Sequence, residues 1–459
     1  MALDMRVDAE HALLDSVYDR LFPLLRSITG PGIEESLRIM AEHMPLEVFG
    51  VASGTQVFDW EVPPQWDCRS AVLTGPDGKV VCDMAQSNLH VVNYSEGIDT
   101  ALTLKDLQNH LHSLPHLPGA VPYVTSYYNR TWGFCLSHSQ RQALKPGTYR
   151  ARINADFSAG RVPLAHTFLD GDSDREILLS SYLCHPSLAN NELSGPLVLL
   201  GLYNRLKAWP HRRHRFRFVL NPETIGSLCY LHLHGDEMRN TLDAGLVLTC
   251  LGGPGSLSYK SSRRENAPGD RLAQHWHARG EPLRLRPFTP TSGSDERQFC
   301  SPGFNLPVGQ FARCAYGDYD GYHNSLDTKA FMTIEALVKS IDEIEAYLKE
   351  LDNVGPWRNL APYGEPQLGR RGLYPNINSA ATWQASSDDV FDGRVILERV
   401  LMVLNYSDGD HDLIAIADKA GCAVRDLLPV VKRLEEGGLL APGEAIHGCT
   451  PVDNLKASQ

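Results

Sequence analysis

The chain has 459 residues, of which 42% are hydrophobic and 21% are charged, with 38 Gly and 29 Pro. This is the composition of a globular protein with several domains, and it excludes a mainly disordered or collagen-like chain. The formal net charge of −12 argues against nonspecific nucleic-acid binding by the chain as a whole.

The first residues carry acids where a secretory signal would have its apolar core, and no run of 18 apolar residues occurs. Ten cysteines are spread along the chain without a CxxC pair, as expected of reduced thiols. The sequence therefore predicts a cytoplasmic protein that has no membrane partner.

The chain divides into segments with different patterns. Apolar residues between Glu10 and Met44 recur at helical spacing and predict two amphipathic helices, interrupted at residues 30–32. Short β-type runs follow and predict an inserted β-rich lobe over residues 47–115. Residues 116–365 then alternate apolar strands with helical stretches. Together with residues 1–46, they predict an α/β catalytic domain whose largely parallel sheet is covered by helices on both faces.

The end of the chain predicts a separate module. Residues 355–375 are rich in Pro and Gly, which indicates a linker or an extended strap. Three helical stretches then follow in the order of a winged helix-turn-helix domain, predicted over residues 385–450. Residues 394–440 carry six basic and eight acidic side chains, a poor footprint for duplex DNA. We expect this module to pack, to form contacts between copies in a homo-oligomer, or to bind a protein partner.

Polar clusters follow four segments of the predicted sheet. Because ligands of open α/β sheets bind at the carboxyl ends of the strands, these side chains are expected at one edge. Imidazole and carboxylate groups suit a divalent metal such as zinc. Taken singly, each residue has an ordinary alternative role as a hydrogen-bonded loop residue or a capping carboxylate. In chain order, the candidates are His185, Asn191, Glu192, Glu223, Asp295, Glu296, Arg297, His323 and Asp327.

One further motif is the basic run HRRHRFR at residues 211–217. Such a run can indicate nucleic-acid binding. It follows Pro210 and leads directly into a predicted core strand, so a solvated turn is the favoured interpretation.

Several motifs together give a resemblance to a known family. The sequence resembles the zinc exopeptidases of the aminopeptidase and carboxypeptidase type, and more closely a bacterial family of aminopeptidase-like proteins with a C-terminal winged helix. The resemblance spans nearly the whole chain, and no single motif carries it alone. Its carriers are FDWEVP, SNLHVVNYS, PYVTSYY, WGFCLSH, CHPSLANNELSG, PETIGS, SDERQFCSPG, YHNSLDT and GEPQLGRRGLYP.

The resemblance implies a role for each matching residue. His185 is similar to the first metal ligand and His323 to the last, with Asp327 as its support. Glu223 matches the general base. Asn191 falls where the bridging Asp of the family is expected, and Thr224 and Thr249 fall where further carboxylate ligands are common.

These three neutral side chains leave too few anionic ligands for two metal ions. We therefore predict one Zn²⁺ ion, held by His185, His323 and a carboxylate, with Glu192 as the first choice and Asp295 as the second. Glu223 would take a proton from the water that attacks an amide bond.

The sequence leaves the substrate open. An aminopeptidase needs an acid for the α-ammonium group, which Asp295 or Glu296 would supply, whereas Arg297 would hold a carboxylate in a carboxypeptidase or an amidase for N-acyl amino acids. The predicted function is zinc-dependent, aminopeptidase-like hydrolysis of a small peptide or aminoacyl substrate. The main alternative is a non-catalytic peptide-binding or regulatory protein on a degenerate exopeptidase fold, and a transcriptional regulator ranks third.

Overall fold

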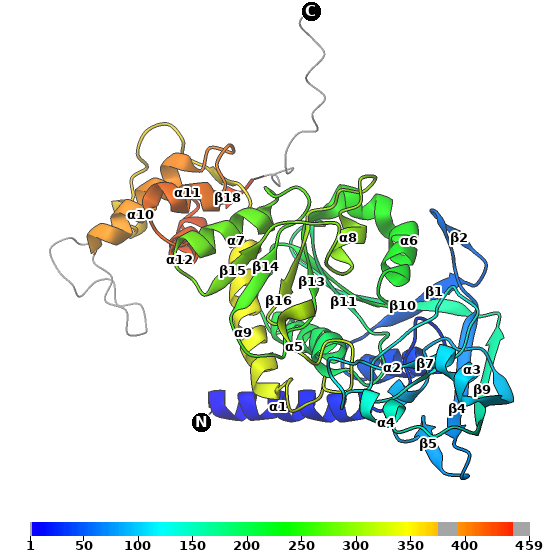
Figure 1. The fold of residues 1–459 in the computed structure, drawn as a ribbon. Coiled ribbons are helices and arrows are strands. Elements are labelled where there is room, and N and C mark those ends of the chain that lie inside the picture. The colour runs from blue at the N-terminus through cyan, green and yellow to red at the C-terminus, as the bar shows by residue number, and fades with distance from the viewer. Residues whose placement is uncertain (1, 375–392, 444–459) are drawn as a thin grey trace, which may run out of the picture.

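The computed structural model describes residues 2–374 and 393–443, and an eight-stranded mixed sheet forms its centre (Figure 1). The strands pair in parallel from β12 through β11 and β13 to β16, while β1 and β10 add antiparallel pairs at one edge. The order across the sheet is β1 (Glu47–Ala52), β10 (Arg161–Leu169), β12 (Arg215–Asn221), β11 (Glu176–Tyr182), β13 (Leu242–Leu248), β16 (Val308–Ala312), β14 (Leu257–Lys260) and β15 (Leu283–Arg286).

The central strands are apolar because both faces of the sheet are covered. Every residue of β11 is buried, as expected of a parallel strand between two layers of helices. α1, α5 and α9 pack against one another on one side, and α6 and α8 contact each other on the other side (Figure 1). The helices of this part of the chain are α1 (Ala2–Leu21), α2 (Pro31–Ala41), α3 (Leu104–Leu107), α4 (His138–Gln142), α5 (Ser194–Lys207), α6 (Ile225–Thr241), α7 (Pro268–Ala278), α8 (Glu296–Phe299) and α9 (Ile334–Leu351).

The β-rich lobe is present, but its boundaries differ from the predicted 47–115. β1 belongs to the main sheet, whereas β9, which lies well beyond residue 115, forms the centre of the lobe by pairing with both β4 and β6. The lobe sheet has the order β5 (Val80–Asp83), β4 (Gln65–Thr74), β9 (Thr148–Ser158) and β6 (Ile98–Thr103). Two small ribbons accompany it, β2 (Gln56–Val57) with β3 (Trp60–Glu61) and β7 (Leu111–His112) with β8 (Phe134–Cys135).

The C-terminal module contains α10 (Gly393–Tyr406), α11 (Leu413–Ala420), α12 (Val424–Glu436) and β18 (Leu440–Pro442). The predicted strap supplies its remaining strand, β17 (Trp357–Asn359), which pairs antiparallel with β18. Of the predicted range 385–450, residues 385–392 and 444–450 lie outside the described residues.

The module docks against the catalytic core through ion pairs. The α7 residues Arg271 and His275 bind Asp412 and Asp418, which lie at the start of α11 and near its end. Within the described ranges, no helix combines the length and the apolarity needed to span a bilayer.

Candidate functional site

His185 lies three residues beyond the end of β11, and Glu192 holds its ring from behind. Oε2 of Glu192 is 2.6 Å from Nδ1 of His185, and Oε1 accepts the backbone N–H of His185 at 2.7 Å. Arg26, from the start of the chain, donates Nε to the His185 carbonyl at 3.0 Å and lies 3.9 Å from the same carboxylate. Because Nδ1 is engaged, Nε2 is the free nitrogen of this ring.

The electrostatic surroundings of His185 are negative. Burial lowers the pKa of His185, but Cys184 and Glu192 outweigh it and hold this pKa well above its ordinary value.

Glu223 follows β12, on the side of the free nitrogen. Its Oε2 is 3.6 Å from Nε2 of His185, and Oε1 accepts the hydroxyl of Ser294 at 2.6 Å. Burial raises the pKa of Glu223 above its ordinary value. Thr224 has a φ of 63°, a left-handed conformation that costs energy in a non-glycine residue and is common at functional sites.

His323 completes a pair of imidazoles. Its ring centroid lies 5.3 Å from that of His185, and Tyr322 stacks on it at 4.1 Å. Burial and then the neighbouring His185 lower the pKa of His323 to about 3, which keeps the ring neutral. Its Nε2 is buried and has no hydrogen-bond partner among the described residues.

Asn191 lies on a single π-helical turn, Ala189–Leu193, that leads into α5. Asp327 fixes this turn by accepting the backbone N–H groups of Asn190 at 2.8 Å and Asn191 at 2.9 Å. The side-chain nitrogen of Asn191 donates to the hydroxyl of Tyr182, whose oxygen lies 2.6 Å from Oγ1 of Thr249. Oδ1 of Asn191 is buried and lacks a partner within the described part of the chain.

The donor types of this cluster, imidazole, amide and carboxylate, are ones that a divalent cation takes in proteins. Four atoms of this cluster remain available to a ligand: His185 Nε2, His323 Nε2, Asn191 Oδ1 and Glu223 Oε2. Glu223 Oε2 lies 3.6 Å from His185 Nε2, which places this carboxylate beside the free ring nitrogen. The two orphaned polar atoms on His323 and Asn191 are the strongest sign that a ligand belongs here.

Glu192 occupies a different place from the predicted one. Ligand atoms of Cys184, His185 and Glu192 do lie within 4.8 Å of one another. However, the 2.6 Å between Glu192 and Nδ1 of His185 is a hydrogen-bond distance, too short for two ligands of one ion. Its position corrects the direct-ligand prediction and supports an outer role in which the carboxylate orients the histidine.

The predicted substrate acids are also placed differently from expectation. Asp295 is fully buried and accepts hydrogen bonds from the Thr224 amide and the side chains of Asn221 and Ser227. Burial and then Glu223 raise the pKa of Asp295 to about 7. Its contacts fix the turn that carries Glu223, and they leave it neither a metal ligand nor a free acid.

Glu296 is fully buried as well, and its carboxylate binds Lys260 at 2.7 Å and Gln310 at 2.9 Å. Neither acid therefore has a free oxygen for an α-ammonium group. Arg297 is half-buried, donates Nε to the Ser294 carbonyl at 3.2 Å, and forms no ion pair with any described residue.

Three residues of the site were missed at the sequence level. Ser294 is the first residue of the SDERQ motif and could have been included with its acids, and Tyr182 lies in the predicted strand before His185. Arg26 gave no signal, because nothing near it in the sequence indicates a contact 159 residues away.

Comparisons with known proteins agree with this architecture. A family model described as a domain of unknown function, DUF4910, matches residues 15–354, and a winged helix-turn-helix model matches residues 355–442. A presumed polysaccharide biosynthesis protein with an aminopeptidase-like domain, from Clostridium acetobutylicum, is 37% identical over 412 residues, which are 89% of this chain and 92% of that protein.

Two solved structures show the same fold. The crystal structure of a presumed peptidase from Clostridium acetobutylicum has a TM-score of 0.83 at 33% identity, and the match covers 96% of this chain and 99% of that one. A zinc aminopeptidase from Bacillus subtilis has a TM-score of 0.54 at 14% identity, with 75% of this chain and 94% of that chain covered. The second likeness shows the fold alone.

The fold prediction is thereby confirmed: the core has the zinc-aminopeptidase architecture, and a winged helix-turn-helix domain follows it. Since the family model covers most of the chain and the relative matches nearly all of it, the chain belongs to the DUF4910 family, with a C-terminal winged helix-turn-helix domain.

Proposed function

We propose that the chain is a metal-dependent hydrolase that cleaves an amide bond of a peptide or aminoacyl compound. The observation that carries the proposal is the pairing of two imidazoles, His185 and His323, beside Glu223, with an orphaned ring nitrogen on His323 and an orphaned amide oxygen on Asn191. The zinc-aminopeptidase fold and the aminopeptidase-like relative support the same activity class.

His185, His323 and Asn191 would hold one cation, most naturally zinc, with Glu223 at its edge. Such an ion would lower the pKa of a bound water and polarise the scissile carbonyl. At two positions where the exopeptidase resemblance implies further carboxylate ligands, this chain has Asn191 and Thr249. The Tyr182 hydroxyl links these two side chains. This neutral network supports a single ion.

Glu223 is the proposed general base. Ser294 occupies one of its oxygens, so the other remains free to accept a proton from water and to return it to the leaving amine. Its raised pKa suits both transfers, because a stronger base accepts the first proton more readily and its acid form then donates it.

The experiment combines metal analysis with kinetics on the full-length protein. We expect the protein purified without chelator to hold about one zinc ion, and the His185→Ala and His323→Ala variants to lose it. Glu223→Gln should keep the fold and lower kcat by about 10²–10⁴. Parent-level activity in Glu223→Gln would refute the role of the base.

The end of the substrate that is recognised is a second question, and Arg297 bears on it. Because Asp295 and Glu296 are consumed internally while Arg297 has no carboxylate partner, the site favours a substrate carboxylate over a substrate ammonium. N-acetyl-leucine and leucinamide distinguish the two. If leucinamide is hydrolysed faster than N-acetyl-leucine and Arg297→Met does not change its rate, the aminopeptidase specificity is favoured instead.

The non-catalytic alternative rests on the same neutral side chains, Asn191 and Thr249. It would be favoured if the purified protein held no metal and gained no hydrolase activity with added Zn²⁺, Co²⁺ or Mn²⁺.

A further inference from the structure

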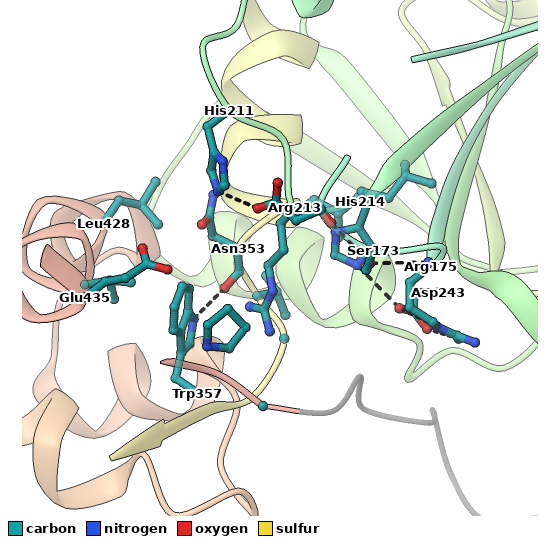
Figure 2. A pocket seen from close by; sticks show the side chains of 18 of the residues that line it. Ser173, Arg175, His211, Arg213, His214, Asp243, Asn353, Trp357, Leu428 and Glu435 are labelled. Atoms are coloured by element: carbon teal, nitrogen blue, oxygen red, sulfur yellow. Dashed lines mark hydrogen bonds and ion pairs between the residues drawn. The ribbon is translucent and has the colours of Figure 1, made fainter. Parts of the chain in front are cut away.

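A cavity of about 790 Å³ lies between the catalytic core and the winged helix (Figure 2). Its core wall includes Ile177 and Arg213, at or just before the starts of β11 and β12, whereas His185 and Glu223 follow the ends of these strands. At about 3.3 Å per residue, the seven residues of β11 separate the two sites by roughly 20 Å. The cavity is therefore distinct from the candidate catalytic site.

Arg213 is the notable charge in this cavity. Its guanidinium lies 4.6 Å from the ring centroid of Trp357, and Nη2 donates to the Pro356 carbonyl at 3.0 Å. Nη1 is buried and has no hydrogen-bond partner among the described residues, and the side chain forms no ion pair with them. A buried donor on a charged group that lacks a partner is costly, so an anionic ligand would be stabilised here.

The other charged groups of the cavity are largely matched. Arg175 pairs with Asp243, and Nε2 of His211 lies 3.2 Å from a carboxylate oxygen of Asp172 (Figure 2). On the opposite wall, Nζ of Lys432 lies 4.0 Å from a carboxylate oxygen of Glu436. Glu435 lines the same wall, is exposed, and makes no ion pair with Arg213. The basic run predicted as a solvated turn thus contributes a partly buried cation to a cavity.

The opposite wall comes from the winged helix itself. α12 is the third helix of the module, the position of the recognition helix that enters the major groove in DNA-binding winged helices. Here it presents Leu428, Val431 and Lys432 to the cavity, and Arg425 at its start forms an ion pair with Glu281 of the core. The catalytic core therefore contacts the first turn of the helix that would read DNA.

We propose that this cavity binds a small organic anion, whose carboxylate or phosphate pairs with Arg213 and whose body lies against the apolar residues Val354, Leu428 and Val431. The volume falls within the range of roughly 300–1,000 Å³ typical of small-molecule sites. Since core and winged helix each supply one wall, the ligand would stabilise their docked arrangement. The inference does not depend on the proposed hydrolase activity.

The test is thermal unfolding of the full-length protein at constant ionic strength with four probes: inorganic phosphate, succinate, glucose 6-phosphate and glucose. We expect the anions to raise Tm and glucose to leave it unchanged, because ligand binding to the native state stabilises it. The separate phosphate and succinate arms identify the preferred anionic group.

Two variants change the affinity in opposite directions. Arg213→Met should weaken anion binding by at least about tenfold. Glu435→Lys, an exposed substitution that leaves the core intact, should tighten it by adding a cation to the wall. Arg212→Met is the matched control, because this neighbouring arginine donates to the carbonyls of Asp170 and Leu206 and does not line the cavity.

His323→Ala separates this cavity from the candidate catalytic site, and the Tm rise should persist in that variant. The proposal is overturned if no anion raises Tm at millimolar concentration, if the rise is lost in His323→Ala, or if Arg213→Met and Glu435→Lys leave the anion affinity of the parent unchanged.

Discussion

Two glutamates lie on opposite sides of one imidazole ring, and their surroundings differ. Glu192 is fully enclosed behind His185, where a ring nitrogen and backbone N–H groups share its carboxylate. Glu223 faces the other ring nitrogen, and a quarter of its side chain is exposed. In the proposed function, the first carboxylate would orient the ring and the second would meet a substrate or a water.

Glu192→Gln tests this division. The amide removes the negative charge behind His185, and supporting groups of this kind typically contribute 10–100-fold in metal affinity. We expect zinc affinity to fall by about that factor while the fold persists, as measured by competition with a chromogenic chelator. Glu335→Gln, at an exposed helix start, serves as the control. Equal affinities would place Glu192 outside the site.

Asn191→Asp tests the single-ion proposal. The substitution supplies an anionic oxygen at the position of the orphaned amide oxygen, and it removes the amide N–H that donates to the Tyr182 hydroxyl. We expect tighter zinc binding and an increase in the number of ions bound per chain, measured by elemental analysis. An unchanged affinity and stoichiometry would show that residue 191 does not contact the metal.

The sequence predicted that His185, Glu223 and His323 lie close together, and the structure shows that they do. Each follows an apolar strand or lies in a motif with a chemical signature. The sequence was not sufficient to place Glu192 or Asp295. Local spacing does not determine which side of a ring a carboxylate occupies, or whether an acid is consumed by hydrogen bonds from a neighbouring turn.

The lobe shows the same limit for elements. β9 pairs with strands from two earlier segments, 65–74 and 98–103, and such pairings leave no local trace in the chain. The alternating pattern of a strand is the same in either sheet, so the lobe was predicted with too short a range. β17 was predicted only as part of a strap, because its pairing with β18 joins residues more than 80 positions apart.

The start of α11 depends on one carboxylate with two tasks. Asp412 accepts the backbone N–H of Ala415 at 2.8 Å as the N-cap of the helix, and it binds Arg271 of α7. We expect Asp412→Ala to cost about 0.5–2 kcal/mol from the lost cap, with a smaller addition from the partly exposed ion pair. Chemical denaturation measures this loss. Asp410→Ala, at an exposed position of the same turn, should have little effect.

At the scale of the whole molecule, His214 connects the start of β12 with the end of α9 and with β13. Burial lowers its pKa, but hydrogen bonds to Asp243 and Asp352 outweigh burial and raise it above the ordinary value. The native state thus binds this proton more tightly than the unfolded chain. The resulting stabilisation is complete below about pH 6.5 and is lost as the pH rises through the raised pKa.

We therefore expect the Tm of the parent protein to fall between about pH 6 and pH 9 more steeply than that of His214→Gln. His116→Gln, which changes an exposed histidine, should follow the parent profile. Parallel profiles for the parent and His214→Gln would exclude this linkage.

The burial of Arg26 against His185 and Glu192 also constrains how the molecule is made. The His185 carbonyl that it binds is synthesised 159 residues later than the arginine itself, and Glu192 follows still later. At ribosomal rates of roughly 5–20 residues per second, the first two helices wait on the order of ten to thirty seconds before that charge is matched. A nascent chain stalled before residue 185 would therefore keep this guanidinium in water, and the first two helices could not take their final place until His185 and Glu192 had been made.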